Sequence, residues 1–369
     1  MRTSSRNGTP ASALPEPWSS RLQGWRQSPW IHSLGRFLAL AVVFGFFAFW
    51  VEGGKFYSPR NLENILRQSA VYATASLGMT MIIISAGIDL SVGSMIALTV
   101  VTVAWVLDLN VTATTAAGTT ETIYLAERYP VLIPWLALSC GILVSVLAGL
   151  CNGAAIVGLR VVPFIVTLGT MGIFRGLAKG LADEKDIYPH KDTWLTQLMD
   201  PTLTSQDPGW RMWILPPGVW LLIVAAVAAA VFLRYTRPGR YMYAIGSNEE
   251  TARLCGVPVT RIKIMTYTLA GLFAGLAGLM QFSFIGGIGQ PTSAVSYELF
   301  IIAAVVIGGG SLMGGQGSIL GSVIGALIIT ILYMGGQQMG WPKWVQEAVI
   351  GLIIILAVVI DRLRQREAT

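Results

Sequence analysis

Long, charge-poor apolar segments recur along the chain and limit what it can fold into. Ten of them are separated by polar turns or loops, and they cover residues 34–50, 66–86, 94–107, 131–151, 161–181, 214–233, 264–285, 298–308, 317–334 and 345–361. A bilayer core of about 30 Å is crossed by about 20 apolar residues in an α-helix. Because lipid offers no partner to backbone polar groups, we predict an all-α polytopic membrane protein, with about ten transmembrane helices in one bundle.

The composition supports a membrane protein and argues against several other classes. Only 12% of the residues are charged, against about 25% in soluble domains. The net charge of +6 comes from arginines clustered in loops and tails. It therefore indicates membrane topology and contact with lipid head groups rather than a nucleic-acid partner. Three cysteines and two histidines, scattered along the chain, predict no metal site, and we expect no cofactor.

The polar segments define a simple domain organisation. Residues 1–33 are predicted to be a disordered tail, residues 34–361 the transmembrane domain, and residues 362–369 a second tail. Residues 108–130 and 182–212 are predicted outer loops. An even number of spans places both termini on one side of the membrane, and the arginine clusters place that side in the cytoplasm.

One polar block, residues 234–263, separates the sixth and seventh spans. Ser247 to Glu250 forms a capping-box pattern, with Ser247 or Asn248 as the helix cap, and Gly256 is a typical helix end. Six cations surround the block: Arg234, Arg237, Arg240, Arg253, Arg261 and Lys263. The pattern predicts a short cytoplasmic helix. Such a helix is either a handle for another protein or a turn of helix in a solvated loop.

Glycine-rich breaks interrupt two apolar regions. The first is flanked by Gly87 and Gly93, and the second holds Gly308, Gly309, Gly310, Gly314 and Gly315. The second break is either an inner turn or a broken helix inside the membrane. Because residues 69–104 and 298–332 both combine an apolar run, a break and a helix of small residues, they are a candidate internal repeat.

The predicted spans offer few ionisable groups for ion coupling. Arg175, Lys179, Glu298 and Glu347 are all placed near outer ends, and Asp89 either caps the third span or lies deeper. A charge-poor path suits a neutral solute, for which hydroxyl, amide and aromatic groups are candidate contacts: Ser91, Ser94, Asn152, Phe164, Thr167 and Thr170. Asn152 is also expected to lie in an inner turn with Gly153.

Nucleotide-binding and catalytic motifs are missing. The sequence GGGSLMGGQGS lacks the Gly-Lys-Ser/Thr ending of a P-loop, so ATP-driven work would need a second subunit. Three hypotheses therefore remain at this point: a transport subunit, a stand-alone secondary carrier of a neutral solute, and a membrane-embedded enzyme or scaffold.

Five motifs, in this order, resemble the ribose-type sugar permeases of bacterial ATP-binding-cassette importers, in the branched-chain amino acid/ribose permease superfamily. They are GMTMIIISAGIDLSVGSMIAL, the Asn152–Gly153 pair, VPFIVTLGTM, YAIGSNEETARLCGVPVTRIKIMTYTLAG and AAVVIGGGSLMGGQGSILGSVIGALI. The resemblance covers most of the chain after about residue 60. Residues 1–33, 108–130 and 182–212 fall outside it, and the 108–130 segment is longer than the corresponding family loop.

The resemblance implies a permease in the bacterial inner membrane that carries a neutral monosaccharide. Its implied partners are a cytoplasmic ATPase, a second permease and a periplasmic sugar-binding protein. Residues of the polar block match the family's ATPase-coupling loop: Gly246, Asn248, Glu249, Glu250, Ala252, Arg253 and Gly256, with Ser247 in the same segment. Neither the sugar nor the choice between a homodimer and a heterodimer follows from these motifs.

Overall fold

The computed structural model describes residues 29–114, 120–202, 205–206 and 208–366. Its helices are α2 (Pro29–Trp50), the short 3₁₀ helix η1 (Glu52–Gly54), α3 (Pro59–Ile84), α4 (Val92–Leu107), α5 (Leu125–Arg128), α6 (Leu132–Leu159), α7 (Pro163–Leu181), α8 (Pro208–Arg211), α9 (Pro217–Tyr235), α10 (Arg237–Ser247), α11 (Glu249–Leu254), α12 (Val259–Phe284), α13 (Tyr297–Ile307), α14 (Ile319–Gln338) and α15 (Lys343–Arg366). The two strands are β1 (Asn110–Thr114) and β2 (Thr120–Tyr124).

Helix length and composition confirm a polytopic membrane protein. By these criteria α6, α7, α9, α12 and α14 are each able to cross a bilayer, and shorter apolar helices lie in α2, α4 and α13. Every predicted span coincides with a described helix, although a total of ten crossings stays a prediction. Helices α2 and α15 reach into the predicted tails, whose remaining residues, 1–28 and 367–369, lie outside the described part of the chain.

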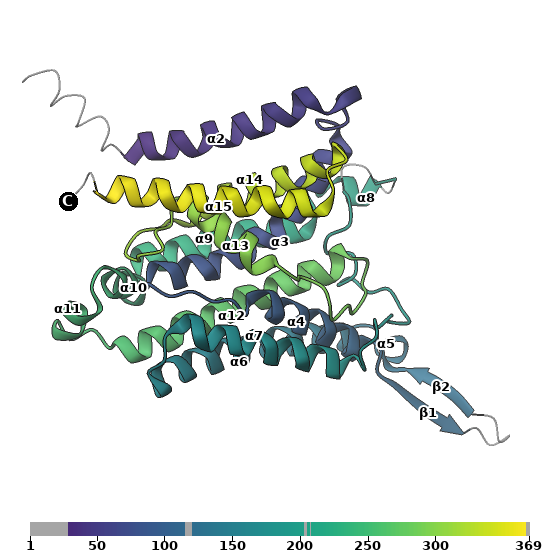
Figure 1. The fold of residues 1–369 in the computed structure, drawn as a ribbon. Helices are drawn as coiled ribbons and strands as arrows, with labels where there is room; N and C mark the ends of the chain where they lie inside the picture. Colours follow the sequence, from purple (N-terminus) through teal and green to yellow (C-terminus); the bar gives the residue numbers. More distant parts are fainter. Residues whose placement is uncertain (1–28, 115–119, 203–204, 207, 367–369) are drawn as a thin grey trace, which may run out of the picture.

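The long helices lie side by side and form one bundle (Figure 1). Helix α12 packs against α3, α4 and α6, while α14 packs against α2, α3 and α13. The α10–α11 pair lies at one end, here called the α11 end, where α2 begins and α15 ends (Figure 1). The strands and α8 lie at the opposite end, here called the hairpin end. Both ends of the described chain therefore lie on the same side of the bundle.

The segment 110–124 corrects the prediction of an entirely helical chain. Strands β1 and β2 pair antiparallel, from Asn110 opposite Tyr124 to Thr114 opposite Thr120. Both strands are rich in β-branched residues, which favour extended backbone. The sequence predicted only an outer loop here, because the segment is rich in threonine and polar.

Asn152 and Gly153 correct a second prediction, because both lie inside α6 and not in a turn. The helix continues to Leu159, and Arg160 follows it with a φ of 54°. Gly153 has a packing role: a β-carbon there would lie 2.8 Å from the Cα of Ile264 on α12. The Asn-Gly pair thus permits close helix approach rather than a chain reversal.

Two short helices, α4 and α13, begin inside the bundle. Their 16 and 11 residues correspond to about 24 Å and about 16 Å, which is less than the thickness of a bilayer core. A β-carbon at Gly93, in the first turn of α4, would lie 2.5 Å from Oε2 of Glu298, in the first turn of α13. Helix α4 leads to the hairpin end and α13 to the α10-contacting loop 308–318, so the two helices run in opposite directions from this meeting point.

The segments before α4 and α13 have the same cap geometry. At the end of α3, the amide of Gly87 donates to the Ile82 carbonyl, and at the end of α12, the amide of Gly287 donates to the Phe282 carbonyl, both at 2.9 Å. The connections 85–91 and 285–296 then return into the bundle. The same bond also closes α13, where the amide of Gly310 donates to the Val305 carbonyl at 2.8 Å. This cap geometry is therefore shared by α3, α12 and α13, and the predicted pairing of residues 69–104 with 298–332 stays a prediction.

Candidate functional site

A buried polar cluster occupies the connection between α3 and α4. The amide and hydroxyl of Ser91 both donate to Oδ1 of Asp89, at 2.7 Å and 2.6 Å. Nδ2 of Asn152, on α6, donates to Oγ of Ser91 at 2.8 Å. All three side chains are buried. We call these residues the Asp89 cluster.

The Asp89 cluster contradicts the prediction that Asp89 caps the third span. Ser91, not Asp89, is the N-cap residue of α4, and the carboxylate lies in the re-entrant connection that precedes the helix. Asp89 is therefore buried in the bundle and is not the N-cap of α4, while its depth in the membrane stays a prediction. Asn152 reaches the cluster because α6 continues past the predicted turn, and the Oδ1 atom of Asn152 has no hydrogen-bond partner among the described residues.

The remaining candidate path residues divide into near and distant ones. The hydroxyl of Thr167 on α7 lies 3.4 Å from the carbonyl oxygen of Ile88, next to Asp89, and is buried. Ser94 is also buried in α4, and within the described residues its hydroxyl has no hydrogen-bond partner. Thr170 donates to the Thr167 carbonyl. Phe164, in contrast, is exposed on α7 and does not share the buried site.

Sequence reasoning placed Arg175 and Glu298 at outer ends, and for Glu298 this is wrong. Gly93 precedes the last residue of α4 by 14 positions, so the neighbouring Glu298 lies about 21 Å below the hairpin end of α4. Nη1 of Arg175 donates to the carbonyls of Pro291 and Ser293, at 2.9 Å and 2.6 Å. The sequence signal for this re-entrant geometry was the unusually short apolar segment 298–308, which follows a connection that contains serine and proline.

The polar block forms two helices at the α11 end, where the sequence predicted one. The side chain of Asn248 accepts a hydrogen bond from the Thr251 amide at 2.8 Å and caps α11, so Asn248 and not Ser247 is the cap. Gly256, with a φ of 81°, follows the end of α11. The preceding helix, α10, was not predicted; Thr236 caps it by accepting from the Gly239 amide.

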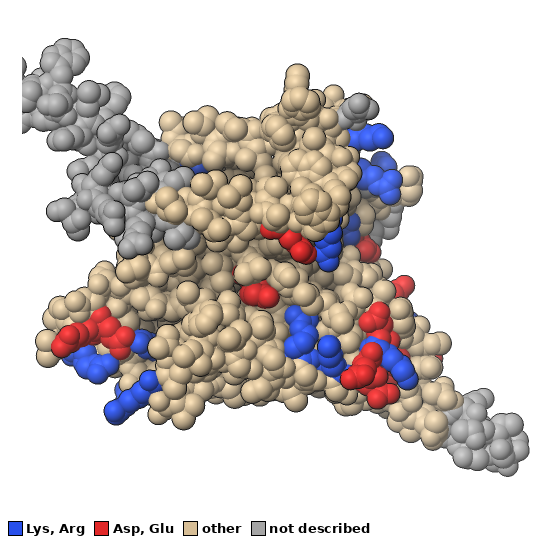
Figure 2. Space-filling view, in the orientation of Figure 1, with Lys and Arg blue, Asp and Glu red and all other residues tan. Residues whose placement is uncertain are grey.

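Ion pairs fix the orientation of α11. Glu249 pairs with Arg253 at 3.1 Å and with Lys263, on α12, at 2.6 Å. Figure 2 shows acidic and basic atoms gathered at this end. Ala252 is buried against the bundle, while Glu250 and Arg253 are exposed. Partly exposed pairs contribute little to stability, but they present a defined charged surface at the tip of the molecule.

The predicted helix-break glycines do not share one role. Gly309, Gly314 and Gly315 adopt positive φ values of 87°, 90° and 72° in the loop between α13 and α14, where a side chain would be strained. Gly308 follows the last residue of α13, Gly310 lies in the same loop, and Gly87 ends the cap of α3. Gly93 is different, because it lies inside the first turn of α4 and permits the approach of Glu298.

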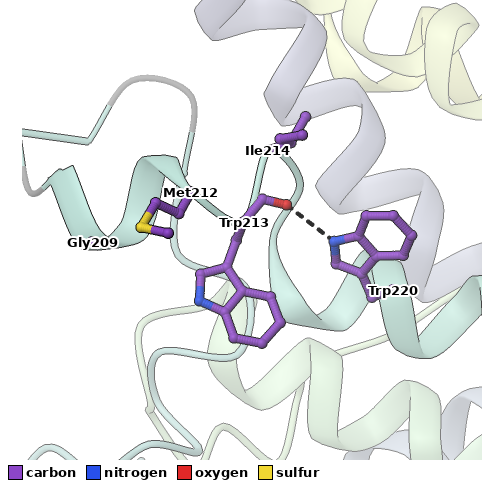
Figure 3. Close-up of a pocket in the computed structure, with 5 residues that line it drawn as sticks. All are labelled: Gly209, Met212, Trp213, Ile214 and Trp220. Carbon is purple, nitrogen blue, oxygen red and sulfur yellow. Dashed lines mark hydrogen bonds between the residues drawn. The ribbon is translucent and has the colours of Figure 1, made fainter.

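A shallow pocket lies at the hairpin end, away from α11. Its lining residues are Gly209, Met212, Trp213, Ile214 and Trp220 (Figure 3). Nε1 of Trp220 donates to the Trp213 carbonyl at 3.1 Å, which holds the loop before α9 against that helix. Among the described residues, no three His, Cys, Asp or Glu side chains are grouped so as to hold a metal ion.

Comparison with known proteins identifies the family. Residues 61–358 match the model of the branched-chain amino acid transport system / permease component family. The chain belongs to this family. The match includes the Asp89 cluster, both re-entrant connections and the α10–α11 pair.

Curated relatives of this permease are named for sugar transport. The ribose import permease RbsC of Escherichia coli K12 is 37% identical over 314 residues, which cover 84% of this chain and 88% of that protein. The fructose import permease FrcC of Rhizobium meliloti is 35% identical over 330 residues, covering 88% and 84%. The L-arabinose transport system permease AraH of E. coli K12 is 33% identical over 333 residues, covering 90% and 91%. No solved structure matched the chain.

These findings confirm that the chain is a transport permease. They favour the permease hypothesis over a stand-alone carrier, an enzyme or a scaffold.

Proposed function

We propose that this permease forms the translocation path for a neutral monosaccharide, which a periplasmic binding protein delivers and a separate ATPase drives across the membrane. The observation that carries the proposal is the α10–α11 pair, a capped and charged helical projection at one end of a bundle whose long helices are apolar. The sugar-transport names of three relatives support the substrate class.

The Asp89 cluster is the proposed polar part of the path. Asp89, Ser91, Asn152 and Thr167 offer carboxylate, hydroxyl and amide groups, which form hydrogen bonds with sugar hydroxyls. They lie beside the start of α4, inside the bundle. A path of this kind suits a neutral solute, because it supplies hydrogen-bonding groups without a row of charges.

A second permease is the proposed neighbour of α7. Four glycines on this helix lie in open surroundings, where a β-carbon would meet no atom within 4 Å: Gly169, Gly172, Gly176 and Gly180. Small residues spaced three or four apart allow close approach of another membrane helix. The exposed Phe164 at the start of α7 fits the same interface better than it fits the buried path.

The α11 end is the proposed cytoplasmic side, with both termini of the permease. The six cations of the polar block favour this orientation. Trp213 and Trp220 at the hairpin end then fall at the opposite membrane surface, where tryptophan is enriched in contact with lipid head groups.

The proposed mechanism is alternating access. The loaded binding protein docks at the hairpin end, and ATP binding closes the ATPase dimer against α11. The permease changes state because these partners bind one of its conformations more tightly than the other. In this mechanism Gly246, Ser247, Asn248, Glu249, Glu250, Ala252, Arg253 and Gly256 form the coupling segment.

Co-purification from native membranes in a mild detergent tests the proposal. We expect a P-loop ATPase to accompany the native chain and to be lost with Arg253→Glu, which reverses the charge of an exposed α11 residue. Arg128→Glu is the matched control, because Arg128 is exposed at the hairpin end. Two differently tagged copies should also co-purify if the second permease is a copy of this chain. Absence of any ATPase from the native sample would contradict the proposal.

A further inference from the structure

The last turn of α10 packs directly against two other segments of backbone. A β-carbon at Gly246 would lie 1.8 Å from the Ile84 carbonyl oxygen at the end of α3, and 2.5 Å from the amide nitrogen of Gly315. A β-carbon at Gly314 would lie 2.6 Å from the Gly246 carbonyl oxygen and 2.7 Å from Cβ of Ala86. We call Ile84, Ala86, Gly246, Gly314 and Gly315 the glycine junction.

Hydrogen bonds join the three segments of the glycine junction. The amide of Gly315 donates to the Ile84 carbonyl at 2.9 Å, which ties loop 308–318 to α3. The hydroxyl of Tyr243 on α10 donates to the Gly317 carbonyl at 3.0 Å, which ties the same loop to α10 just before the coupling segment. Burial raises the pKa of the Tyr243 hydroxyl, so the hydroxyl stays protonated and remains a donor at neutral pH.

Loop 308–318 has a third attachment, to α2. Nη1 of Arg36 donates to Oγ of Ser318 at 3.0 Å, and that oxygen also accepts from the Gly321 amide at 3.1 Å. The loop is therefore held by α2, α3 and α10 together. The positive-φ glycines Gly314 and Gly315 let the backbone of the loop approach the ends of α3 and α10 closely, whereas α2 reaches the loop through the Arg36 side chain.

The glycine junction is close in sequence to the proposed path. Ile84 is the last residue of α3, and Asp89 follows five positions later in the re-entrant connection. Backbone packed against backbone has no side chain that can rotate to absorb a displacement, and close-packed interiors transmit strain. A shift of α10 therefore moves the end of α3 and the start of α14 together.

We propose that the glycine junction carries the movement of α10–α11 to the Asp89 cluster, with Tyr243 as the positioning residue that keeps α10 and loop 308–318 in register. This inference rests on the proposed function, because the movement originates in the ATPase. The inference goes beyond the proposed function by assigning a role to one contact, the hydrogen bond from the Tyr243 hydroxyl to the Gly317 carbonyl. Packing of α10 alone would not need this bond.

Tyr243→Phe in the reconstituted importer tests the inference. The change removes one hydroxyl and keeps the ring, and Tyr241→Phe is the matched control on the same helix, since both tyrosines are partly buried. The complete complex with its ATPase and binding protein is placed in vesicles. ATP hydrolysis and sugar uptake are then measured together. The informative quantity is sugar transported per ATP, because a loss of stability would lower both rates and leave their ratio unchanged.

We expect Tyr243→Phe to lower sugar transported per ATP about three- to ten-fold, as the loss of one net hydrogen bond permits. Tyr241→Phe should leave the ratio unchanged, and the ATPase should co-purify with both variants. A normal ratio in Tyr243→Phe, with a working native complex, would overturn the inference alone. A native chain that neither binds an ATPase nor supports ATP-dependent uptake would overturn the proposed function, and the inference with it.

Discussion

The connections 85–91 and 285–296 share a cap geometry but differ in how they are held. The first has seven residues and supplies its own acceptor, because Asp89 receives two hydrogen bonds from Ser91. The second has twelve residues, and its carbonyls at Pro291 and Ser293 are held by Arg175 from α7. From outside, the Asn152 side chain of α6 donates to Oγ of Ser91 at 2.8 Å, while the two contacts to the Ile88 carbonyl are longer, at 3.4 Å from Thr167 and 3.5 Å from Tyr267.

This difference indicates that the two connections respond differently when α7 moves. The 85–91 connection is fixed from within and by α6, so we expect it to keep its shape when α7 moves. The 285–296 connection is held from outside, by the Arg175 side chain of α7, the helix whose glycine face is open, and by backbone pairing of Gly289 with Ile187. Any shift of α7 against a neighbouring permease would therefore reach α13 through Arg175.

The largest expected effect comes from a side chain forced into the meeting point of α4 and α13. Gly93→Val places atoms where Glu298 and the Ala294 carbonyl now lie, within 2.6 Å. We expect a loss of about 3 kcal/mol in stability, at the upper end of overpacking costs, and loss of uptake. Thermal unfolding of the purified protein in detergent measures the first, and vesicle uptake the second.

Gly158→Val is the control for this change, because a β-carbon at Gly158 of α6 would meet open space. Its effect should stay within about 0.5 kcal/mol. Equal destabilisation by the two variants would show that α4 and α13 do not meet as described.

An intermediate effect is expected from the self-contained connection. Asp89→Ala removes the acceptor for the amide and hydroxyl of Ser91, both buried, and should cost about 2 kcal/mol. Asp89→Asn retains an oxygen acceptor in the same place and should cost about half as much. The same unfolding assay compares them. If the two substitutions proved equally harmful, the negative charge rather than the hydrogen bonds would be the important property.

The smallest global effect is expected from the externally held connection. Arg175→Lys keeps the charge but has one nitrogen where Arg175 uses two, Nη1 for the carbonyls of Pro291 and Ser293 and Nη2 for that of Ala294. Stability should therefore fall by only about 1 kcal/mol. Hydrogen exchange should nevertheless quicken in residues 285–296 and stay unchanged in 85–91. Lys179→Arg, an exposed change one turn later on α7, should alter neither segment. Faster exchange in both connections would remove the proposed distinction between them.

The sequence predicted the features that depend on local composition, namely the positions of most helices. Runs of apolar residues located the helices, and the capping pattern placed the start of α11 within one residue of Asn248. Helix α10 was not predicted because its arginines, glycines and tyrosines show no membrane-like apolar run. Strand pairing in 110–124 had a usable signal in its β-branched residues.

Depth in the membrane was the property that the sequence did not provide. Counting spans in order assumes that each one crosses fully, so Glu298 was placed at an outer end although α13 begins inside the bundle. Asn152 was misplaced because Asn-Gly commonly marks a turn, whereas here the tertiary contacts of Gly153 and Ser91 favour a continuous helix. Both errors concern contacts between residues that are far apart in the sequence.

The shortness of α13 also has a consequence for how the chain enters the membrane. A free segment of about 16 Å leaves its terminal amides and carbonyls inside hydrocarbon, which lipid cannot satisfy. Helix α13 is therefore unsuited to insertion on its own during synthesis, and it needs α3 and α14, against which it packs, before it is stable at depth. Biogenesis of the second half of this permease is then a collective step, and chains truncated between α13 and α14 should leave α13 accessible to water-soluble labels.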